Sequence, residues 1–156
     1  MARDTGEPDP VLVVRGMYEA FERGDIPAVL AAMHPDVEWV ESAAASFPHR
    51  GTHVGHAAIT EHVFGNVAEN WREFAIVPQD FFRDGDTVIV RGVVRAVARA
   101  SGRSMSAPYV HVFTFAGGKL RRYTDHQDTA VWAEALALPR RGPDQPSSRP
   151  PEEEGT

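Results

Sequence analysis

Three polar side chains in this sequence lie among apolar residues and could carry protons. Asp125 lies within the run YTDHQD, and His111 alternates with apolar and aromatic residues. Glu41 follows Trp39 by two residues. A carboxyl or imidazole group that is removed from water has a shifted pKa and can act as a general acid or base near neutral pH. We therefore interpret Asp125, His111 and Glu41 as candidate catalytic residues.

Each of these residues also has a structural interpretation. Asp125 could form an ion pair with an arginine, and the arginines in question are Arg91, Arg95 and Arg122. His111 could be a core histidine that is bonded to a nearby carboxylate. Glu41 could lie at a rim in water, because the following run of small residues at 42–46 gives no sign of burial.

Aromatic side chains share the predicted strand faces of these groups. In a strand, residues two apart point to the same side. By this rule, the aromatic neighbours are Trp39, Tyr109, Phe113 and Tyr123. Their faces indicate an apolar lining beside the polar groups.

A Gly-Gly turn at 117–118 indicates which residues face each other across one hairpin. For a turn at this place, residues whose numbers sum to about 235 lie opposite each other. Asp125 then pairs near Val110, and Tyr109 and His111 flank it within one cross-strand step. A carboxylate at that distance can fix the tautomer of an imidazole or share a proton with it.

Four histidines between residues 49 and 62 are candidate metal ligands, but their spacing gives only weak support for a metal site. They are His49, His53, His56 and His62. No pair of them has the i, i+4 spacing on a predicted helix that fixes two imidazoles on one metal. We expect neither a metal nor a cofactor.

Length and composition restrict the class of protein. The chain has 156 residues, enough for one domain, and its net charge of −6 argues against nucleic acid or an anionic membrane as a partner. It has no cysteine, and we find no apolar stretch long enough for a secretory signal or a membrane span. These features predict a soluble cytoplasmic protein.

Helical spacing predicts three helices before the four long strands and one after them, with a further strand between the second and third helices. Asp9-Pro10 and Asp25 are typical helix starts, and Gly24 separates the first two helices. Met33 completes the predicted apolar stripe of the second helix, after Ile26, Val29 and Leu30. The third helix is expected at 56–71, and the last, capped by Asp128, at 129–138.

Alternation of apolar and polar residues predicts five strands. They are expected at 36–42, 73–83, 86–100, 103–116 and 119–128, with a loop at 43–55. Helices followed by long antiparallel strands indicate an α+β fold in which helices cover one face of a bent sheet.

Five segments resemble the NTF2-like superfamily, and within it the SnoaL-like polyketide cyclases and the relatives of ketosteroid isomerase. The segments are YEAFERGDIPAVLAAMHPDVEWVES, GHAAITEHVF, DFFRDGDTVIVRG, HVFTFAGGKLRRYTD and the closing DTA. The resemblance implies a cone made of a strongly bent antiparallel sheet covered by three N-terminal helices. It places the domain at 9–138, between a flexible N-terminus at 1–8 and a disordered tail at 139–156.

The resemblance also assigns roles to the polar residues. Asp125 matches the acid/base aspartate of SnoaL-like cyclases, and His111 matches the acidic oxyanion-hole group of ketosteroid isomerases. Glu41 lies sixteen residues after Asp25, where ketosteroid isomerases carry their proton-shuttling carboxylate. Tyr18, which otherwise reads as core packing on the first helix, becomes a candidate substrate-binding residue together with Trp39, Tyr109, Phe113 and Tyr123.

The function implied is cofactor-independent acid/base catalysis on a hydrophobic carbonyl small molecule by a cyclase, isomerase or dehydratase (a lyase). Two alternatives are a non-catalytic binding protein and a structural dimer module. Limonene-type epoxide hydrolysis is disfavoured, because our alignment puts Gly92 and Val94 where that reaction needs an arginine and an aspartate. The family also suggests a homodimer, and the predicted outer face of the strand at 86–100 carries Ile89, Val93 and Val97.

Overall fold

Two capped helices open the fold. The computed structural model of the chain describes residues 6–41 and 50–137. Helix α1 (Pro10–Glu22) begins after Asp9, whose side chain accepts a hydrogen bond of 2.9 Å from the amide of Val11. Helix α2 (Ile26–Ala31) begins after Asp25, whose side chain accepts from the amide of Ala28 at 3.1 Å. Both predicted helix starts are confirmed.

The second and third helices end earlier than predicted, because the residues at their predicted ends pair with strands of the sheet instead. Met33 begins strand β1 (Met33–Glu41), where it pairs with Leu120, so its assignment to helix was wrong. The predicted helix at 56–71 consists of three segments and ends at Asn70. These are α3 (His56–Ile59), the π-helical turn η1 (Thr60–Phe64) and α4 (Gly65–Asn70). Trp71 already pairs with Ala98 in the sheet.

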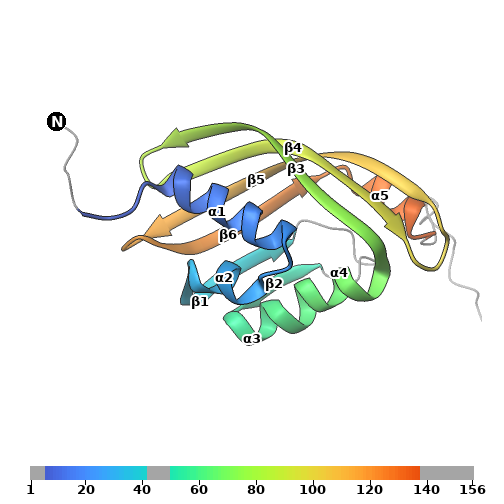
Figure 1. The fold of residues 1–156 in the computed structure, drawn as a ribbon, viewed down its shortest axis with the longest axis horizontal. Helices are drawn as coiled ribbons and strands as arrows, with labels where there is room; N and C mark the ends of the chain where they lie inside the picture. Colours follow the sequence, from blue (N-terminus) through green and yellow to red (C-terminus); the bar gives the residue numbers. More distant parts are fainter. Residues whose placement is uncertain (1–5, 42–49, 138–156) are drawn as a thin grey trace, which may run out of the picture.

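A curved sheet of six strands carries the rest of the fold, in the order β2-β1-β6-β5-β4-β3 (Figure 1). Besides β1, the strands are β2 (Gly51–Val54), β3 (Trp71–Asp84), β4 (Thr87–Ala98), β5 (Ser104–Ala116) and β6 (Lys119–Gln127). Helix α5 (Thr129–Ala135) follows, capped by Asp128 as predicted. The short strand β2 lies within the segment that was predicted to be a loop.

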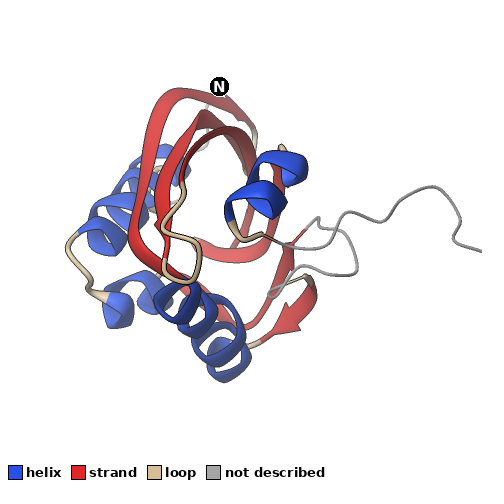
Figure 2. Ribbon diagram, turned by 90° about the vertical axis from the view of Figure 1, so that its right-hand side faces the viewer, coloured by secondary structure: helices blue, strands red, loops and turns tan. Residues whose placement is uncertain are grey.

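The sheet is mixed, which corrects the expectation of an antiparallel one. Strand β1 pairs with β6 in the parallel sense, while the three long hairpins β3 to β6 are antiparallel. A hairpin turn forces antiparallel pairing between consecutive strands, whereas β1 and β6 are far apart in the sequence and have no such restriction. Figure 2 shows the strongly bent sheet and the helices packed against it.

The predicted flexible N-terminus overlaps residues 1–5, and the predicted tail begins near residue 138. Both of these segments, like residues 42–49, lie outside the described residues. No helix within the described ranges has both the length and the apolar composition needed to cross a membrane.

Gly92 allows the sheet to close tightly over an aromatic ring. It lies opposite Tyr109 on β5 and opposite Pro78 on β3. A Cβ atom at position 92 would collide with the carbonyl oxygen of Val77 and lie 2.6 Å from the hydroxyl oxygen of Tyr109. The absence of a side chain is therefore a packing requirement of the strand.

We expect Gly92→Ala to lower the free energy of unfolding by about 1–3 kcal/mol, because the added methyl group overpacks the sheet. Gly16→Ala is the matched control, since Gly16 has open space around it in helix α1. That control should be neutral or stabilising, because alanine is the better helix former. Urea denaturation of both variants tests this, and equal stability of Gly92→Ala and the parent would contradict the packing argument.

Candidate functional site

Glu41, Asp125 and His111 form one row across three neighbouring strands. Glu41 on β1 is the register partner of Asp125 on β6, and Asp125 is the partner of His111 on β5. Their exposed fractions are only 6%, 5% and 4%. The three residues singled out in the sequence are thus brought together, and the interpretation of Glu41 as a rim residue in water was wrong.

A bulge in β6 puts Asp125 in this row. The pairs at the turn, such as Phe115 with Leu120, follow the predicted sum of 235, but the register shifts by one residue after Thr114. Beyond the shift Asp125 lies opposite His111, not opposite Val110 as predicted. The extra residue in β6 accounts for the difference, because a slip of one residue exchanges the two faces of a strand.

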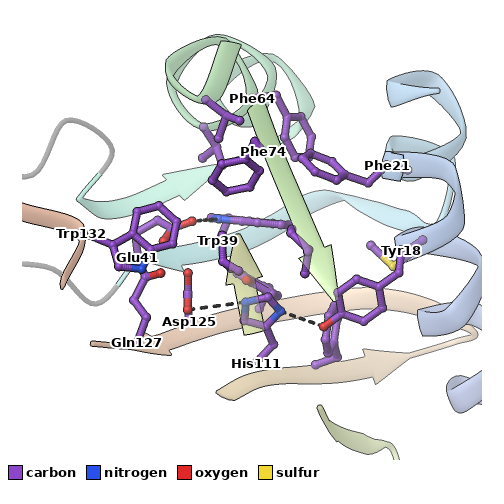
Figure 3. Close-up of a pocket in the computed structure, with 18 residues that line it drawn as sticks. Tyr18, Phe21, Trp39, Glu41, Phe64, Phe74, His111, Asp125, Gln127 and Trp132 are labelled. Atoms are coloured by element: carbon purple, nitrogen blue, oxygen red, sulfur yellow. Dashed lines mark hydrogen bonds and ion pairs between the residues drawn. The ribbon is translucent and has the colours of Figure 1, made fainter. Parts of the chain in front are cut away.

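Short contacts extend the row at both ends (Figure 3). The Tyr18 hydroxyl lies 2.7 Å from Nδ1 of His111, and Nε2 of His111 lies 3.6 Å from Oδ1 of Asp125. At the other end, the indole N–H of Trp39 donates to Oε1 of Glu41 at 2.6 Å. Five side chains from α1, β5, β6 and β1 therefore form one polar path along the wall.

The arginines proposed as partners of Asp125 are engaged elsewhere or exposed. Arg91 donates to Asp80 at 2.8 Å, and Arg122 donates to Glu38 at 2.9 Å. Arg95 is exposed. Asp125 therefore faces an imidazole and a second carboxyl group instead of a guanidinium group.

Burial shifts the pKa values of both His111 and Asp125 toward their uncharged forms. Desolvation lowers the pKa of His111 to about 3, so its imidazole is neutral. Desolvation, followed by the neighbouring charge of Glu41, raises the pKa of Asp125 well above its ordinary value. The raised pKa favours the protonated form of Asp125, which is the form that a general acid needs.

The row forms the polar wall of an otherwise apolar cavity. The cavity measures about 70 Å³. Besides the row and Tyr18, the lining consists of Met17, Phe21, Val29, Trp39, Val63, Phe64, Val67, Phe74, Ile76, Val94, Phe113, Tyr123, Gln127 and Trp132. An apolar pocket with a few convergent polar groups is the usual form of a small-molecule site.

Four of the five predicted substrate-binding residues line this cavity: Tyr18, Trp39, Phe113 and Tyr123. Tyr109 does not. Its ring stacks on His111 with centroids 3.8 Å apart, and its hydroxyl lies against Gly92. The structure therefore places Tyr109 behind the imidazole of His111, outside the lining where we expected it to bind substrate.

Sequence reasoning missed the far wall of the cavity. The π-helical turn η1 brings two successive residues, Val63 and Phe64, to the lining. Helical periodicity cannot show this, because a π turn changes the angle between residues. Gln127 could have been found, since it lies two residues after Asp125 on the same face.

The other histidines singled out in the sequence do not line this cavity, as far as the structure describes them. His56 Nε2 lies 3.2 Å from the carbonyl oxygen of Met33, and the rings of His53 and His62 lie 5.8 Å apart. His49 lies outside the described residues. Within residues 6–41 and 50–137, no group of three or more His, Asp or Glu side chains could hold a metal ion.

Comparisons with known proteins agree with this architecture. The family model described as SnoaL-like domain matches residues 14–123. An NTF2-like protein of unknown function from Burkholderia pseudomallei is 32% identical, with a TM-score of 0.76, over 83% of this chain and 98% of that one. TerC, co-crystallized with polyporic acid, is 30% identical with a TM-score of 0.76, over 82% and 98%.

A more distant structure shares only the fold. It is a hypothetical protein with a ketosteroid isomerase-like fold from Catenulispora acidiphila, in complex with trimethylamine. It is 14% identical with a TM-score of 0.69, over 85% of this chain and 95% of that one. The comparison with curated proteins finds no match.

We expect Asp125→Asn to change how stability depends on pH. The native pKa of Asp125 is raised, so the native state holds a proton that the unfolded chain loses above about pH 4. Its contribution to stability is therefore lost as pH rises toward the native pKa. His111 acts in the opposite sense, and only while pH falls from about 6.5 toward 3.

The effect of His111 is common to the parent and to Asp125→Asn, so the difference between their two curves reports Asp125. As pH rises above about 4, the thermal midpoint of the parent should fall relative to that of Asp125→Asn. Asp80→Asn, a carboxyl group paired with Arg91 at 2.8 Å, is the control and should follow the parent. Parallel curves for parent and Asp125→Asn would contradict the assigned protonation state.

Proposed function

The chain belongs to the SnoaL-like domain family, and we propose that it is a cofactor-independent acid/base enzyme acting on a hydrophobic carbonyl compound. Its reaction would be an isomerisation, a cyclisation or a lyase-type elimination. The observation that carries the proposal is the buried row of Glu41, Asp125 and His111 in a cavity with aromatic walls. Such a row supplies a proton donor and a proton acceptor at one place.

Enolisation follows from the two adjacent carboxyl groups. Asp125, which carries a proton, donates it to the carbonyl oxygen of the substrate. The carboxylate of Glu41 takes a proton from the carbon next to that carbonyl group. One O–H and one C–H bond break, and one new O–H bond forms on the substrate and one on Glu41, so the product is the neutral enol.

The same two carboxyl groups can return to their starting protonation states without another proton donor or acceptor. After the first step Glu41 holds the proton and Asp125 is ionised. Glu41 can return its proton to a different carbon, which completes an isomerisation, while Asp125 recovers its own from the enol. Two carboxyl groups at register-partner positions favour such a state, because like charges so close cannot both ionise easily.

His111 and Tyr18 would hold Asp125 in position. When Tyr18 donates to Nδ1, the hydrogen on the imidazole sits at Nε2 and faces Asp125. Because His111 is neutral, it can polarise the carboxyl group without adding a charge. That arrangement stabilises Asp125 once it has given up its proton.

Epoxide hydrolysis remains disfavoured. Gly92 has no side chain to offer, and Val94 presents an apolar side chain to the cavity. The cavity lining that the structure describes includes no arginine or lysine to bind an epoxide oxygen.

A second candidate is a small-molecule-binding protein without catalysis. The short contacts of Tyr18 with His111 and of Trp39 with Glu41 favour it, because these polar groups already have partners. The pocket and its ligand class would be the same, so turnover distinguishes the two candidates.

We expect the chain to catalyse exchange of the methylene hydrogens of phenylacetone in D₂O, followed by proton NMR. Asp125→Asn should slow this exchange by about a hundredfold or more, the size typical of a lost acid or base. Glu41→Gln should do the same, and the double variant should be little slower than either single variant, because the two act as one unit.

Asp80→Asn is the control and should exchange hydrogens at the parent rate. If Asp125→Asn keeps full turnover but melts early, Asp125 is structural and the assignment is wrong. Binding without exchange by the parent would favour the second candidate.

We also propose that the chain forms a homodimer through the outer face of the sheet. Phe82, Ile89 and Val110 are 54%, 37% and 36% exposed there, and Val93 and Val97 are half-buried beside them. Ile89 is the register partner of Phe82 on β3, so the exposed apolar side chains are contiguous. A contiguous apolar surface of this kind is typical of an interface.

Light scattering should give twice the chain mass of 17.1 kDa at micromolar concentration. Ile89→Asp should shift the protein to the monomer, because a carboxylate would be buried without a partner. Leu12→Asp, at a residue 65% exposed on α1, should leave the mass unchanged. A parent mass of one chain would contradict the proposal.

A further inference from the structure

We infer that Gln127 binds a second, uncharged polar group of the ligand, about 7 Å along the strand from the group that Asp125 serves. The inference rests on the proposed function for the carbonyl group and adds a requirement on the rest of the ligand. It makes the ligand class a carbonyl compound that carries a hydroxyl or amide group about 7 Å from its carbonyl group.

Gln127 is a half-buried residue whose amide group is buried. Both its amide nitrogen and its amide oxygen are inaccessible to solvent, and neither has a hydrogen-bond partner among the described residues. Buried polar groups are almost always paired, because leaving one unpaired in an apolar site is costly. An amide that lines a ligand cavity and lacks both partners indicates that the ligand supplies them.

The position of Gln127 fixes where that second group lies. Gln127 is two residues after Asp125 on β6, so the two side chains point to the same face about 7 Å apart. Figure 3 shows Gln127 at the Trp132 end of the cavity, away from Tyr18. Its partner across the sheet is Tyr109, whose hydroxyl lies against Gly92 and leaves the amide free.

The chemistry of the amide defines the group. Glutamine offers both a donor and an acceptor, which a hydroxyl or an amide of a ligand can satisfy together. No lysine or arginine lines the cavity within the described residues, so a carboxylate or phosphate would find no counter-charge. The second group is therefore neutral.

Two probes test this requirement: acetophenone, which has one polar group, and 4-hydroxyacetophenone, which adds a hydroxyl across the ring. We expect the parent to bind the hydroxylated probe about fivefold to tenfold more tightly, the size of one or two neutral hydrogen bonds. NMR titration gives both affinities and also reports the side-chain amide signals of Gln127, which should shift with the hydroxylated probe only.

Gln127→Leu should bind both probes equally, with acetophenone bound at least as well as by the parent. Gln127→Met, closer in shape, provides a second variant if the first fails to fold. Gln79→Leu, at an exposed position on β3, should keep the preference of the parent.

Equal binding of the two probes by the parent, or a preference that survives in Gln127→Leu, would overturn the inference and leave the acid/base proposal intact. Failure of the parent to bind either probe would overturn both, because the proposed ligand class itself would then be wrong.

Discussion

Two carboxyl groups and an imidazole share one dry row, and the properties of the site follow from that placement. Glu41, Asp125 and His111 are each less than a tenth exposed, in a cavity with mostly apolar walls. Desolvation disfavours a charge on His111 and on Asp125, so it lowers the pKa of the imidazole and raises the pKa of the carboxyl group. The raised pKa favours Asp125 as a proton donor, and the lowered pKa keeps the imidazole of His111 neutral.

The architecture creates the row by joining segments that are distant in sequence. Parallel pairing of β1 with β6 sets Glu41 beside Asp125, and the bulge in β6 sets Asp125 opposite His111. Helix α1 then adds Tyr18 from one side, and η1 and α4 add apolar side chains from the other. Helices α1 and α4 and the turn η1 therefore all contribute to the lining.

The two other polar side chains considered near the row, those of Tyr109 and Gln127, have different roles. The ring of Tyr109 stacks on His111 and its hydroxyl lies against Gly92, so Tyr109 supports the imidazole. Gln127 points into the cavity with its amide unpaired among the described residues. Two residues that are register partners thus have different tasks, one inside the wall and one at its surface.

The sequence by itself determined the local features: the caps at Asp9 and Asp25, the three long hairpins, and the faces on which Asp125 and His111 lie. Caps and alternation depend on neighbours a few residues away, so they can be read directly. Tertiary structure decided the parallel pairing of β1, the register of Asp125, the burial of Glu41 and the direction of Tyr109. These depend on contacts between distant segments, and a single extra residue in β6 is enough to change which side chains meet.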